Sequence, residues 1–364
     1  MNSGTRLSQA LSDPQLGARL VAAIRAEAAA LPPVSIMEVC GTHTVAIRRS
    51  GIPGLLPPSV RLVSGPGCPV CVTPNETLDQ AIALAGIAGV TVASFGDMLR
   101  VPGTRSSLAQ ARARGADVRV VYSPLDAVAL ARAEPRRKVV FLAVGFETTA
   151  PTVAAALLSA QDVSNFYLFS AHKLVPPALR ALFARPDFAV DGLLLPGHVS
   201  AIIGADAYRP LADERRIPCV VAGFEPGDVL LSILMLLRQM RRRASEVEIE
   251  YRAVVSGPGN RTAQEIMARV FQPEASRWRG LGEIPESGLA LRPAFAERDA
   301  RAVFDILPQE SREPAGCRCG EVLVGAVRPP ECPLFGTACD PAHPVGPCMV
   351  SSEGTCAAYH RYGG

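Results

Sequence analysis

Lysine is scarce in this sequence of 364 residues, where Lys138 and Lys173 are the only two. Arginine supplies the other basic residues, and 37 basic against 34 acidic side chains leave a formal net charge of only +3. No arginine run is longer than the three residues 241–243. Since a nucleic-acid-binding protein concentrates its basic residues in a patch or along one helix, we expect no nucleic-acid partner.

Long apolar runs and an export signal are also missing. Residues 1–30 have helical periodicity ahead of Pro32 and Pro33, without the basic-then-apolar order of a signal peptide. The longest apolar stretch, residues 229–237, is far shorter than the roughly 20 residues that cross a bilayer. We therefore expect a cytoplasmic protein with no membrane partner. Disulfides are rare in that reducing compartment, so the ten cysteines favour metal or redox chemistry.

Residues 34–222 repeat one unit, in which a short apolar run is followed by a turn rich in Gly, Pro or Ser and then by a helical segment. This pattern is typical of alternating strands and helices, and nearly continuous apolar runs favour strands covered on both faces of a parallel sheet. The expected strands are Val34–Val39, Val60–Ser64, Val90–Ser94, Val118–Tyr122, Val139–Val144, Phe166–Ser170, Gly192–Leu195 and Cys219–Ala222.

The pattern predicts an α/β fold made of two parallel-sheet α/β domains and a C-terminal cysteine-rich domain. The expected strands could instead form one barrel, but their spacing varies and motifs occur in both halves. We expect an N-terminal helical segment at residues 1–33, the α/β domains at 34–120 and 121–225, and the third domain at 226–364. In open sheets of this kind the carboxyl ends of the strands form the ligand-binding crevice.

The first expected strand ends in the run Glu38 to His43, which places the Cys40 thiol and the His43 imidazole on one strand-to-helix turn. Both groups can bind a soft metal, and the N–H groups at the start of a helix favour a thiolate with a lowered pKa. The same spacing is compatible with a buried cysteine beside a capping threonine and a surface histidine. Spacing alone favours neither interpretation.

The second expected strand ends in a sharper motif, because Cys68 and Cys71 form a Cys-x-x-Cys loop stiffened by two prolines and followed by a helix from about Asn75. Two thiols at this spacing can close a small disulfide ring, and the helix N-terminus stabilises the attacking thiolate, so redox chemistry is favoured. The alternative is half of a zinc site. Its other ligands would have to come from Cys40, His43, His172, His198 or Cys219.

Other strand ends carry polar groups, namely Asp97, Glu147 with two threonines, His172 with Lys173, and His198. Each has an ordinary explanation as a helix cap or a structural histidine, but several polar groups in one crevice indicate a site. We count Glu147 among the candidate catalytic residues. The sequence lacks the P-loop, Gly-x-Gly-x-x-Gly and His-Glu-x-x-His motifs, so nucleotide binding has no direct support.

The C-terminal tail has the strongest signal, because six of the ten cysteines lie within residues 317–356. They are Cys317, Cys319, Cys332, Cys339, Cys348 and Cys356. No Cys-x-x-Cys pair occurs among them, so zinc-ribbon spacing is absent, whereas an iron–sulfur cluster accepts four thiolates from separated loop positions. We therefore expect an iron–sulfur domain here, with two thiols left beside the cluster as a redox pair.

Together these motifs resemble the HypD family of hydrogenase maturation factors. The resemblance is carried by Glu38–His43, Gly65–Cys71, Ser94–Met98, Gly145–Pro151, Leu195–Val199, Cys332–Gly336 and Gly346–Ser351. These strings are long, unusual and in the family's order, and they span nearly the whole chain beyond the N-terminal helical segment. The assignment is therefore more specific than any single spacing.

The resemblance implies an iron–sulfur scaffold protein of [NiFe]-hydrogenase maturation, without a simple turnover reaction of its own. With a small HypC-type chaperone, the protein would hold iron while the Fe(CN)2CO unit is assembled. Cyanide would come from a HypE-type partner. The family's fold, two α/β domains against a third domain with a [4Fe-4S] cluster, agrees with the expected organisation.

The resemblance also implies roles for the cysteines. The [4Fe-4S] cluster ligands would be Cys317, Cys332, Cys339 and Cys356. Cys319 and Cys348 would form the neighbouring redox pair, and Cys68 and Cys71 a second pair nearer the iron.

Low-spin iron that carries cyanide and carbon monoxide needs a soft thiolate ligand, and Cys40 is the best-placed candidate, with His43 beside it. Two thiol pairs and a cluster could relay electrons toward that iron. Two other classes remain open. A stand-alone cluster-dependent disulfide reductase would hold no iron beyond its cluster, and a zinc-stabilised binding module would be colourless.

Overall fold

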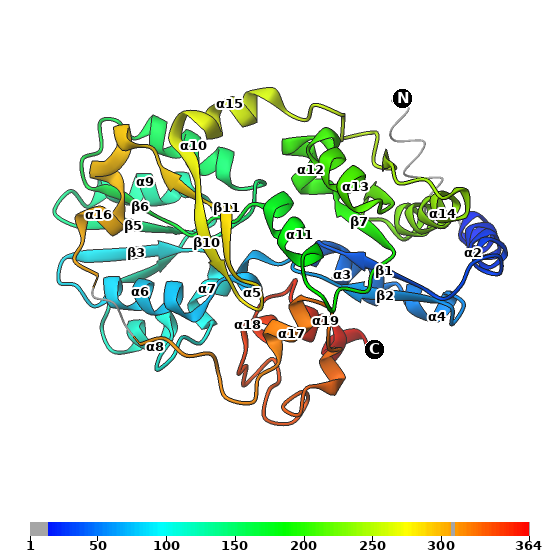
Figure 1. The fold of residues 1–364 in the computed structure, drawn as a ribbon. Coiled ribbons are helices and arrows are strands. Elements are labelled where there is room, and N and C mark those ends of the chain that lie inside the picture. The colour runs from blue at the N-terminus through cyan, green and yellow to red at the C-terminus, as the bar shows by residue number, and fades with distance from the viewer. Residues whose placement is uncertain (1–13, 307–309, 364) are drawn as a thin grey trace.

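The computed structural model describes residues 14–306 and 310–363 and has an α/β fold, as the sequence predicts (Figure 1). It contains two parallel sheets, an antiparallel hairpin and a C-terminal region of short helices. Part of the expected N-terminal helical segment is present as α2 (Pro14–Ala28), while residues 1–13 lie outside the described residues. None of the described helices has the length and apolar character needed to cross a membrane.

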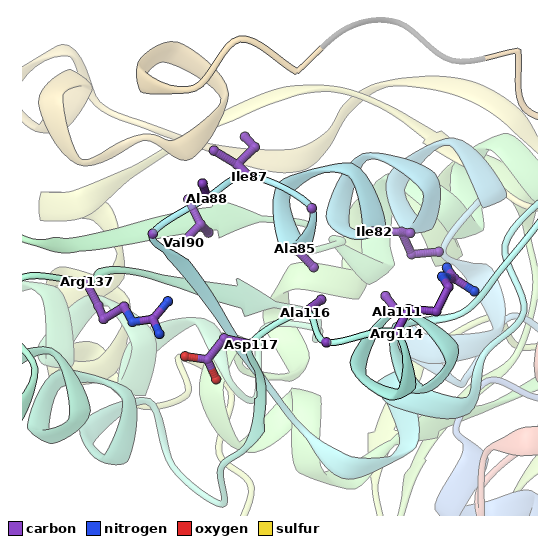
Figure 2. A pocket seen from close by; sticks show the side chains of 13 residues that line it. Ile82, Ala85, Ile87, Ala88, Val90, Ala111, Arg114, Ala116, Asp117 and Arg137 are labelled. Carbon is purple, nitrogen blue, oxygen red and sulfur yellow. The ribbon is translucent and has the colours of Figure 1, made fainter.

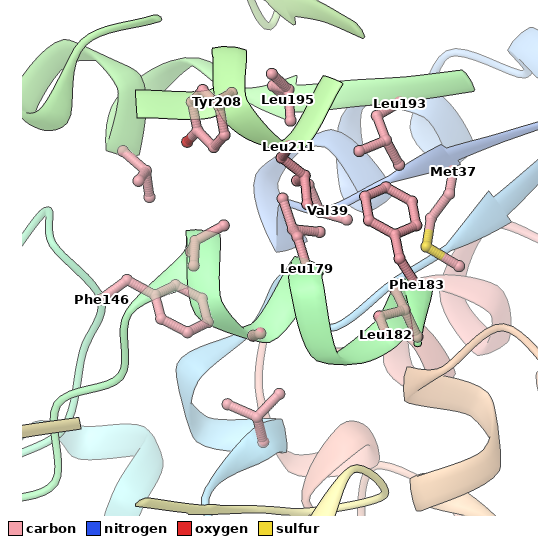
Figure 3. Packing of buried hydrophobic residues seen from close by; sticks show 14 of the residues in the cluster. Met37, Val39, Phe146, Leu179, Leu182, Phe183, Leu193, Leu195, Tyr208 and Leu211 are labelled. Atoms are coloured by element: carbon pink, nitrogen blue, oxygen red, sulfur yellow. The ribbon is translucent and has the colours of Figure 1, made fainter. Parts of the chain in front are cut away.

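The first sheet has the strand order β2-β1-β7-β8-β9, and all its neighbouring strands are parallel. Its strands are β1 (Val34–Glu38), β2 (Val60–Ser64), β7 (Gly192–Pro196), β8 (Cys219–Ala222) and β9 (Val247–Ile249). Side chains alternate between its faces. Ile36 and Leu194 pack with α2 and with α14 (Pro226–Arg242), whereas Met37, Leu193 and Leu195 pack with α11 (Val175–Phe183) and α13 (Arg209–Arg215) (Figure 3).

The second sheet has the order β4-β3-β5-β6 and is also parallel. Its strands are β3 (Val90–Ser94), β4 (Val118–Val120), β5 (Lys138–Ala143) and β6 (Phe166–Ser170). One face packs with α9 (Pro124–Ala133) and α10 (Ala150–Ser159), and the other with α6 (Asn75–Ala85) and α8 (Leu108–Ala113). All the strands expected from the sequence are therefore present in the two sheets.

The sheets do not divide the chain as expected. Strands β1 and β2 share a sheet with β7, which lies after the whole second sheet in the sequence, while β3 and β4 share the other sheet with β5 and β6. The expected boundary between residues 120 and 121 therefore cuts through one sheet, and that between 225 and 226 separates α14 and β9 from the sheet they belong to. The error has a physical reason, because apolar runs indicate strands but not which strands become neighbours.

The remaining helices of this α/β part are short and connect the strands. They are α3 (Gly41–Arg49), α4 (Ile52–Leu55), α5 (Pro69–Val72), α7 (Gly96–Arg100), α12 (Gly197–Ile203) and the 3-10 turn η1 (Ala205–Tyr208). Of these, α3 and α5 follow the carboxyl ends of β1 and β2, where the first two cysteine motifs lie.

A hairpin that the sequence analysis did not predict follows α15 (Arg261–Val270). It pairs β10 (Phe271–Trp278) with β11 (Gly282–Leu291) in antiparallel register, with an irregularity between Glu274 and Ser276. The proline at 273 and the charged residues of β10 obscure its strand pattern. In Figure 1 the hairpin runs from α15 to the region around α5.

The C-terminal region has little regular structure. After η2 (Pro293–Arg298) and α16 (Ala300–Val303), it contains α17 (Cys319–Leu323), η3 (Pro329–Glu331), α18 (Pro347–Val350) and α19 (Thr355–Tyr362). Helices α17 and α18 contact α5, and α19 contacts α3 (Figure 1). The cysteine-rich tail therefore lies at the carboxyl ends of β1 and β2.

Candidate functional site

Cys40 and the loop of residues 68–71 lie side by side because β1 and β2 are parallel neighbours. The backbone N–H of Gly41 donates to the Gly67 carbonyl oxygen at 2.8 Å. Glycine is required at position 67, since a Cβ atom there would lie 2.2 Å from the backbone nitrogen of Cys40. The two motifs that the sequence singled out thus form one site.

The Cys40 thiol is buried at the start of α3. Its backbone N–H donates to Glu38 Oε2 at 3.0 Å. Burial raises the pKa of the Cys40 thiol to about 12, and the carboxylates of Glu353 and Glu38 add to the shift. The expectation of a lowered pKa was wrong, because the loss of hydration outweighs the helix N-terminus.

His43 is fully buried, so the interpretation of it as a surface histidine was wrong. Its Nε2 lies 2.9 Å from the Gly223 carbonyl oxygen, and its ring stacks on Phe224 with 4.7 Å between centroids. Burial lowers its pKa to about 4, so the ring is neutral at pH 7. Because Nε2–H donates to the carbonyl, Nδ1 carries the free lone pair, and it has no hydrogen-bond partner among the described residues.

Residues that the sequence analysis did not assign to the site complete the rim of the Cys40 turn. Thr42 Oγ1 donates to Glu353 Oε1 at 2.7 Å, and this hydrogen bond links the tail to α3. Phe224 stacks on His198 at 4.0 Å as well as on His43. The recurrence of Gly-Phe-Glu at 145–147 and 223–225 was a usable signal for Phe224, but nothing in the sequence indicated Glu353.

Cys68 and Cys71 are joined by a disulfide across the short helix α5, and both side chains are buried. The backbone N–H of Cys71 also lies 3.2 Å from Cys68 Sγ, so the sulfur caps this helix. This bonded state is the one that the redox interpretation of the motif expects.

The six cysteines of the tail line one small cavity. The other lining side chains are apolar: Val322, Leu334, Phe335 and Met349. Cys319 Sγ and Cys348 Sγ are 2.7 Å apart and not joined by a disulfide. Cys339 Sγ accepts a hydrogen bond from the Val345 N–H at 3.3 Å.

The donor set of this cavity fits an iron–sulfur cluster in number and kind, because sulfur is the only polar donor from a lining side chain. Within residues 14–306 and 310–363, no group of three or more His, Cys, Asp or Glu side chains is placed so that it could hold a metal ion. The thiolates of a cluster bind different iron atoms, so they need not converge on one point. Cys317, Cys332, Cys339 and Cys356 remain once the close pair is set aside.

The two thiol pairs belong to the same buried cluster of side chains. Cys68 and Cys71 pack there with Cys319 and Cys348, and α5 contacts both α17 and α18. Cys317 and Cys356 pack against this cluster from its edge. The three cysteine-bearing segments are therefore neighbours in order, since the Cys40 turn contacts Gly67 and α5 contacts α17 and α18 of the tail.

Glu147 lies in the loop after β5, next to Phe146, which belongs to the same buried cluster as Leu193 and Leu195 of the first sheet. Its Oε1 accepts a hydrogen bond from the Val175 N–H at 2.9 Å, and its Oε2 has no partner among the described residues. Burial raises the pKa of this carboxyl to about 7. Burial also raises the pKa of Tyr208, with smaller contributions from Glu147 and Cys40, so all three lie in one neighbourhood.

The polar residues of the other strand ends divide between the site and the hairpin. Asp97 Oδ2 accepts from the Ser352 N–H of the tail at 3.3 Å. His172 instead meets the edge of Phe271 at 5.4 Å, and Lys173 Nζ donates to Ser276 Oγ. The expected convergence therefore includes Asp97, Glu147 and His198 but not His172 or Lys173.

Figure 2 shows a separate pocket at the amino ends of β3 and β4. Arg114, Asp117 and Arg137 contribute its charged side chains, and no cysteine or histidine lines it. Asp117 already accepts hydrogen bonds from Thr91 and Arg119. This pocket lies at the opposite end of the strands from the cysteine motifs and has no part in their chemistry.

Comparison with known proteins shows which family the chain is similar to. The HypD family model, described as "Hydrogenase formation hypA family", matches residues 15–363. A hydrogenase maturation factor HypD from Escherichia coli (strain K12) is 50% identical over 333 residues, which cover 91% of this chain and 89% of the relative. One from Azotobacter vinelandii is 48% identical over 354 residues, covering 95% and 93%.

A third relative, the hydrogenase maturation factor HypD of Rhodobacter capsulatus, is 46% identical over 364 residues, which cover 97% of both chains. The family model thus covers all the described residues except Pro14. The chain belongs to the HypD family.

Proposed function

We propose that this protein is the iron–sulfur scaffold of [NiFe]-hydrogenase maturation, which holds iron while cyanide and carbon monoxide are installed on it. The observation that carries the proposal is the continuity of the sulfur sites. The Cys40 turn touches the Cys68–Cys71 loop, helix α5 of that loop contacts α17 and α18 of the tail, and the tail cysteines line one cavity. The relatives of this protein are named hydrogenase maturation factors, and hydrogenase maturation is the process that this chemistry would serve.

Cys40 supplies the protein's own ligand to the iron, which is the cargo of the scaffold. Because burial raises the pKa of its thiol to about 12, the free protein holds a proton on Sγ that must leave when the thiolate binds. His43 follows one helical turn later, and its Nδ1 lone pair is available either to ligate the iron or to orient it.

The two thiol pairs relay reducing equivalents. Cys319 and Cys348, with sulfurs 2.7 Å apart, can close a disulfide by giving up two electrons and two protons, which open the Cys68–Cys71 disulfide. A [4Fe-4S] cluster bound by Cys317, Cys332, Cys339 and Cys356 would supply the electrons to the first pair.

Glu147 is the proton-handling residue of this proposal. Its carboxyl is buried, and its pKa of about 7 lets it exist in both protonation states under physiological conditions. The proton resides at Oε2, the oxygen without a hydrogen-bond partner among the described residues. Tyr208 lies within electrostatic reach of both Glu147 and Cys40.

The partners of the scaffold are a small HypC-type chaperone and a HypE-type cyanide donor, acting in the cytoplasm. The rim around Cys40 offers them polar groups, since His198 is exposed and Thr42 and Glu353 are half-buried. A chaperone docked on this rim would supply further ligands to an iron that is bound to Cys40.

Complementation tests the proposal. The protein, expressed in cells that lack their own HypD protein, should restore [NiFe]-hydrogenase activity and co-purify anaerobically with the chaperone and with iron beyond the cluster. Cells that remain without hydrogenase activity despite full expression of the chain and its partners would refute it.

The second candidate is a stand-alone disulfide reductase, which the presence of a disulfide and a thiol pair in one buried cluster favours. The exposed fractions of Cys68 and Cys71 are only 3% and 0%, so a protein substrate could not reach their sulfurs without local opening. Iron bound beyond the cluster separates the two candidates, because a reductase of this kind would hold none.

A further inference from the structure

Arg279 lies at the tip of the β10–β11 hairpin with its side chain almost fully buried. Its Nε donates to the Cys71 carbonyl oxygen at 3.0 Å, and its Nη2 donates to the Thr73 carbonyl oxygen at 2.8 Å and to Asn75 Oδ1 at 2.9 Å. The remaining nitrogen, Nη1, pairs with the half-exposed Glu313. The guanidinium therefore satisfies carbonyl groups at the end of α5, where a short helix leaves them without partners.

The hairpin tip also contacts the helix that begins at Cys319. A Cβ atom on Gly280 would lie 2.3 Å from the Gly320 carbonyl oxygen, so the two backbones touch. On the other side of the tip, the Arg279 backbone N–H donates to the Val72 carbonyl oxygen at 2.8 Å. The tip thus bridges the Cys68–Cys71 disulfide and the tail thiol pair.

The positive charge of Arg279 gives this residue an electrostatic role in addition to its hydrogen bonds. Arg279 Nε lies 3.0 Å from the carbonyl oxygen of Cys71, and the neighbouring Gly280 touches Gly320, the residue after Cys319, so Arg279 lies beside both thiol-bearing segments. A fixed positive charge favours a nearby thiolate, and low local polarity strengthens the effect. In a cluster of otherwise apolar side chains and sulfurs, such a charge matters whenever a sulfur becomes an anion.

We propose that Arg279 is a positioning residue that offsets the negative charge carried by sulfur while reducing equivalents pass between the two thiol pairs. The proposal rests on the redox part of the proposed function. In the transfer, a thiolate of the Cys319/Cys348 pair attacks one sulfur of the Cys68–Cys71 disulfide, and a mixed disulfide forms as the old S–S bond breaks. The released thiolate takes up the proton that the attacking thiol lost.

The second tail thiol then loses its proton and attacks the mixed disulfide, so that the tail pair becomes a disulfide and the second sulfur of Cys68–Cys71 leaves and is protonated. Two electrons and two protons have passed in total. Each half of the exchange places an anion on a sulfur near Arg279, and the same guanidinium fixes the end of α5 through its hydrogen bonds.

The test is the rate at which the Cys68–Cys71 disulfide is lost after dithiothreitol is added to the full-length, anaerobically purified protein, followed by alkylation and mass spectrometry. Arg279→Gln should slow this loss about tenfold, whereas Arg279→Lys, which keeps the charge but loses the planar fork, should stay within about threefold of wild type. Arg277→Gln, at an exposed position of β10 in the same hairpin, is the matched control and should change nothing.

Wild-type rates in Arg279→Gln would overturn the proposal, and so would equal slowing in Arg279→Lys, since charge would then be irrelevant. If Arg279→Gln does not fold, Glu313→Gln decides, because removing this half-exposed counter-charge should speed the exchange severalfold and an unchanged rate would contradict the account. The assay needs neither iron cargo nor hydrogenase, so failure of the scaffold function in cells would leave these rates unaffected.

Discussion

The two sheets and the cysteine-rich tail are stabilised in different ways. The sheets bury apolar side chains on both faces, and strand residues such as Phe141, Leu194 and Val220 have no exposed surface. The tail has only short helices. The buried residues of its own apolar cluster are Cys339, Met349 and Ala357. We therefore expect the sheets to fold from their sequence alone, and the tail to depend on the proposed cluster.

The largest effect is expected from a cluster ligand. Cys332→Ala should bleach the brown colour of the anaerobically purified protein, unfold the tail and abolish maturation, because cluster binding there is coupled to folding. Visible absorbance, iron and sulfide content, and limited proteolysis of the tail measure these losses. Cys317, Cys339 and Cys356 should behave alike.

Cys219→Ala is the matched control for that variant. Cys219 is a buried thiol of the first sheet, whose Sγ donates to the Ile217 carbonyl oxygen. Its loss should cost about 1 kcal/mol of the free energy of unfolding and leave the colour unchanged. Full iron and sulfide in the Cys332 variant would remove the ligand assignment.

The second effect concerns the Cys68–Cys71 disulfide, which lies where the tail meets the first sheet. Cys68→Ser or Cys71→Ser should abolish maturation and lower the free energy of unfolding by no more than about 2 kcal/mol, since a bridge across so short a loop restrains little chain. Denaturant unfolding and hydrogenase activity in cells measure the two effects. Thiols that stay unreactive in reduced wild-type protein, together with fully active serine variants, would make the redox role untenable.

The smallest effect is a pH dependence carried by Glu147 in the sheet region. Its folded-state pKa is raised from 4.5 to about 7, so the folded protein binds more protons than the unfolded chain between these values. The contribution of this carboxyl to stability is therefore lost as pH rises from about 4.5 to 7, by about 3 kcal/mol in all.

Glu147→Gln removes that pH dependence. The free energy of unfolding of the variant minus that of the wild type should therefore rise by about 3 kcal/mol between pH 5 and pH 8. Chemical denaturation of both proteins at the two pH values checks this. A difference that is constant with pH would mean that the carboxyl has an ordinary pKa in the folded protein.

The same contrast between regions explains what the sequence could predict. Continuous apolar runs predicted every strand of the parallel sheets except the short edge strand β9, because burial on both faces leaves a local signal. They did not predict that β7 pairs with β1 rather than with β6, since strand order depends on contacts between distant segments. The hairpin escaped notice because β10 contains Pro273 and an irregular register.

For the site, the sequence identified the reactive side chains but not their burial or their neighbours in the fold. Cysteine spacing identified Cys40, the Cys68–Cys71 pair and the tail cysteines, since these side chains are rare and clustered. The burial that raises the pKa of Cys40 and neutralises His43 comes from segments far away in sequence, such as residues 223–224 and 353. Arg279 could not be found at all, because a single arginine has no distinctive spacing.

The most direct test of the central claim, that Cys40 holds the maturing iron, is infrared spectroscopy of Cys40→Ala co-purified anaerobically with its chaperone. The account predicts that the cyanide and carbonyl stretching bands disappear, while the visible absorbance of the tail cluster remains at the wild-type level. Even Cys40→Ser should lose the bands, because an alcohol is a poor ligand for this soft iron. Bands of wild-type intensity in the alanine variant would contradict the account and assign the iron to the chaperone or to another residue.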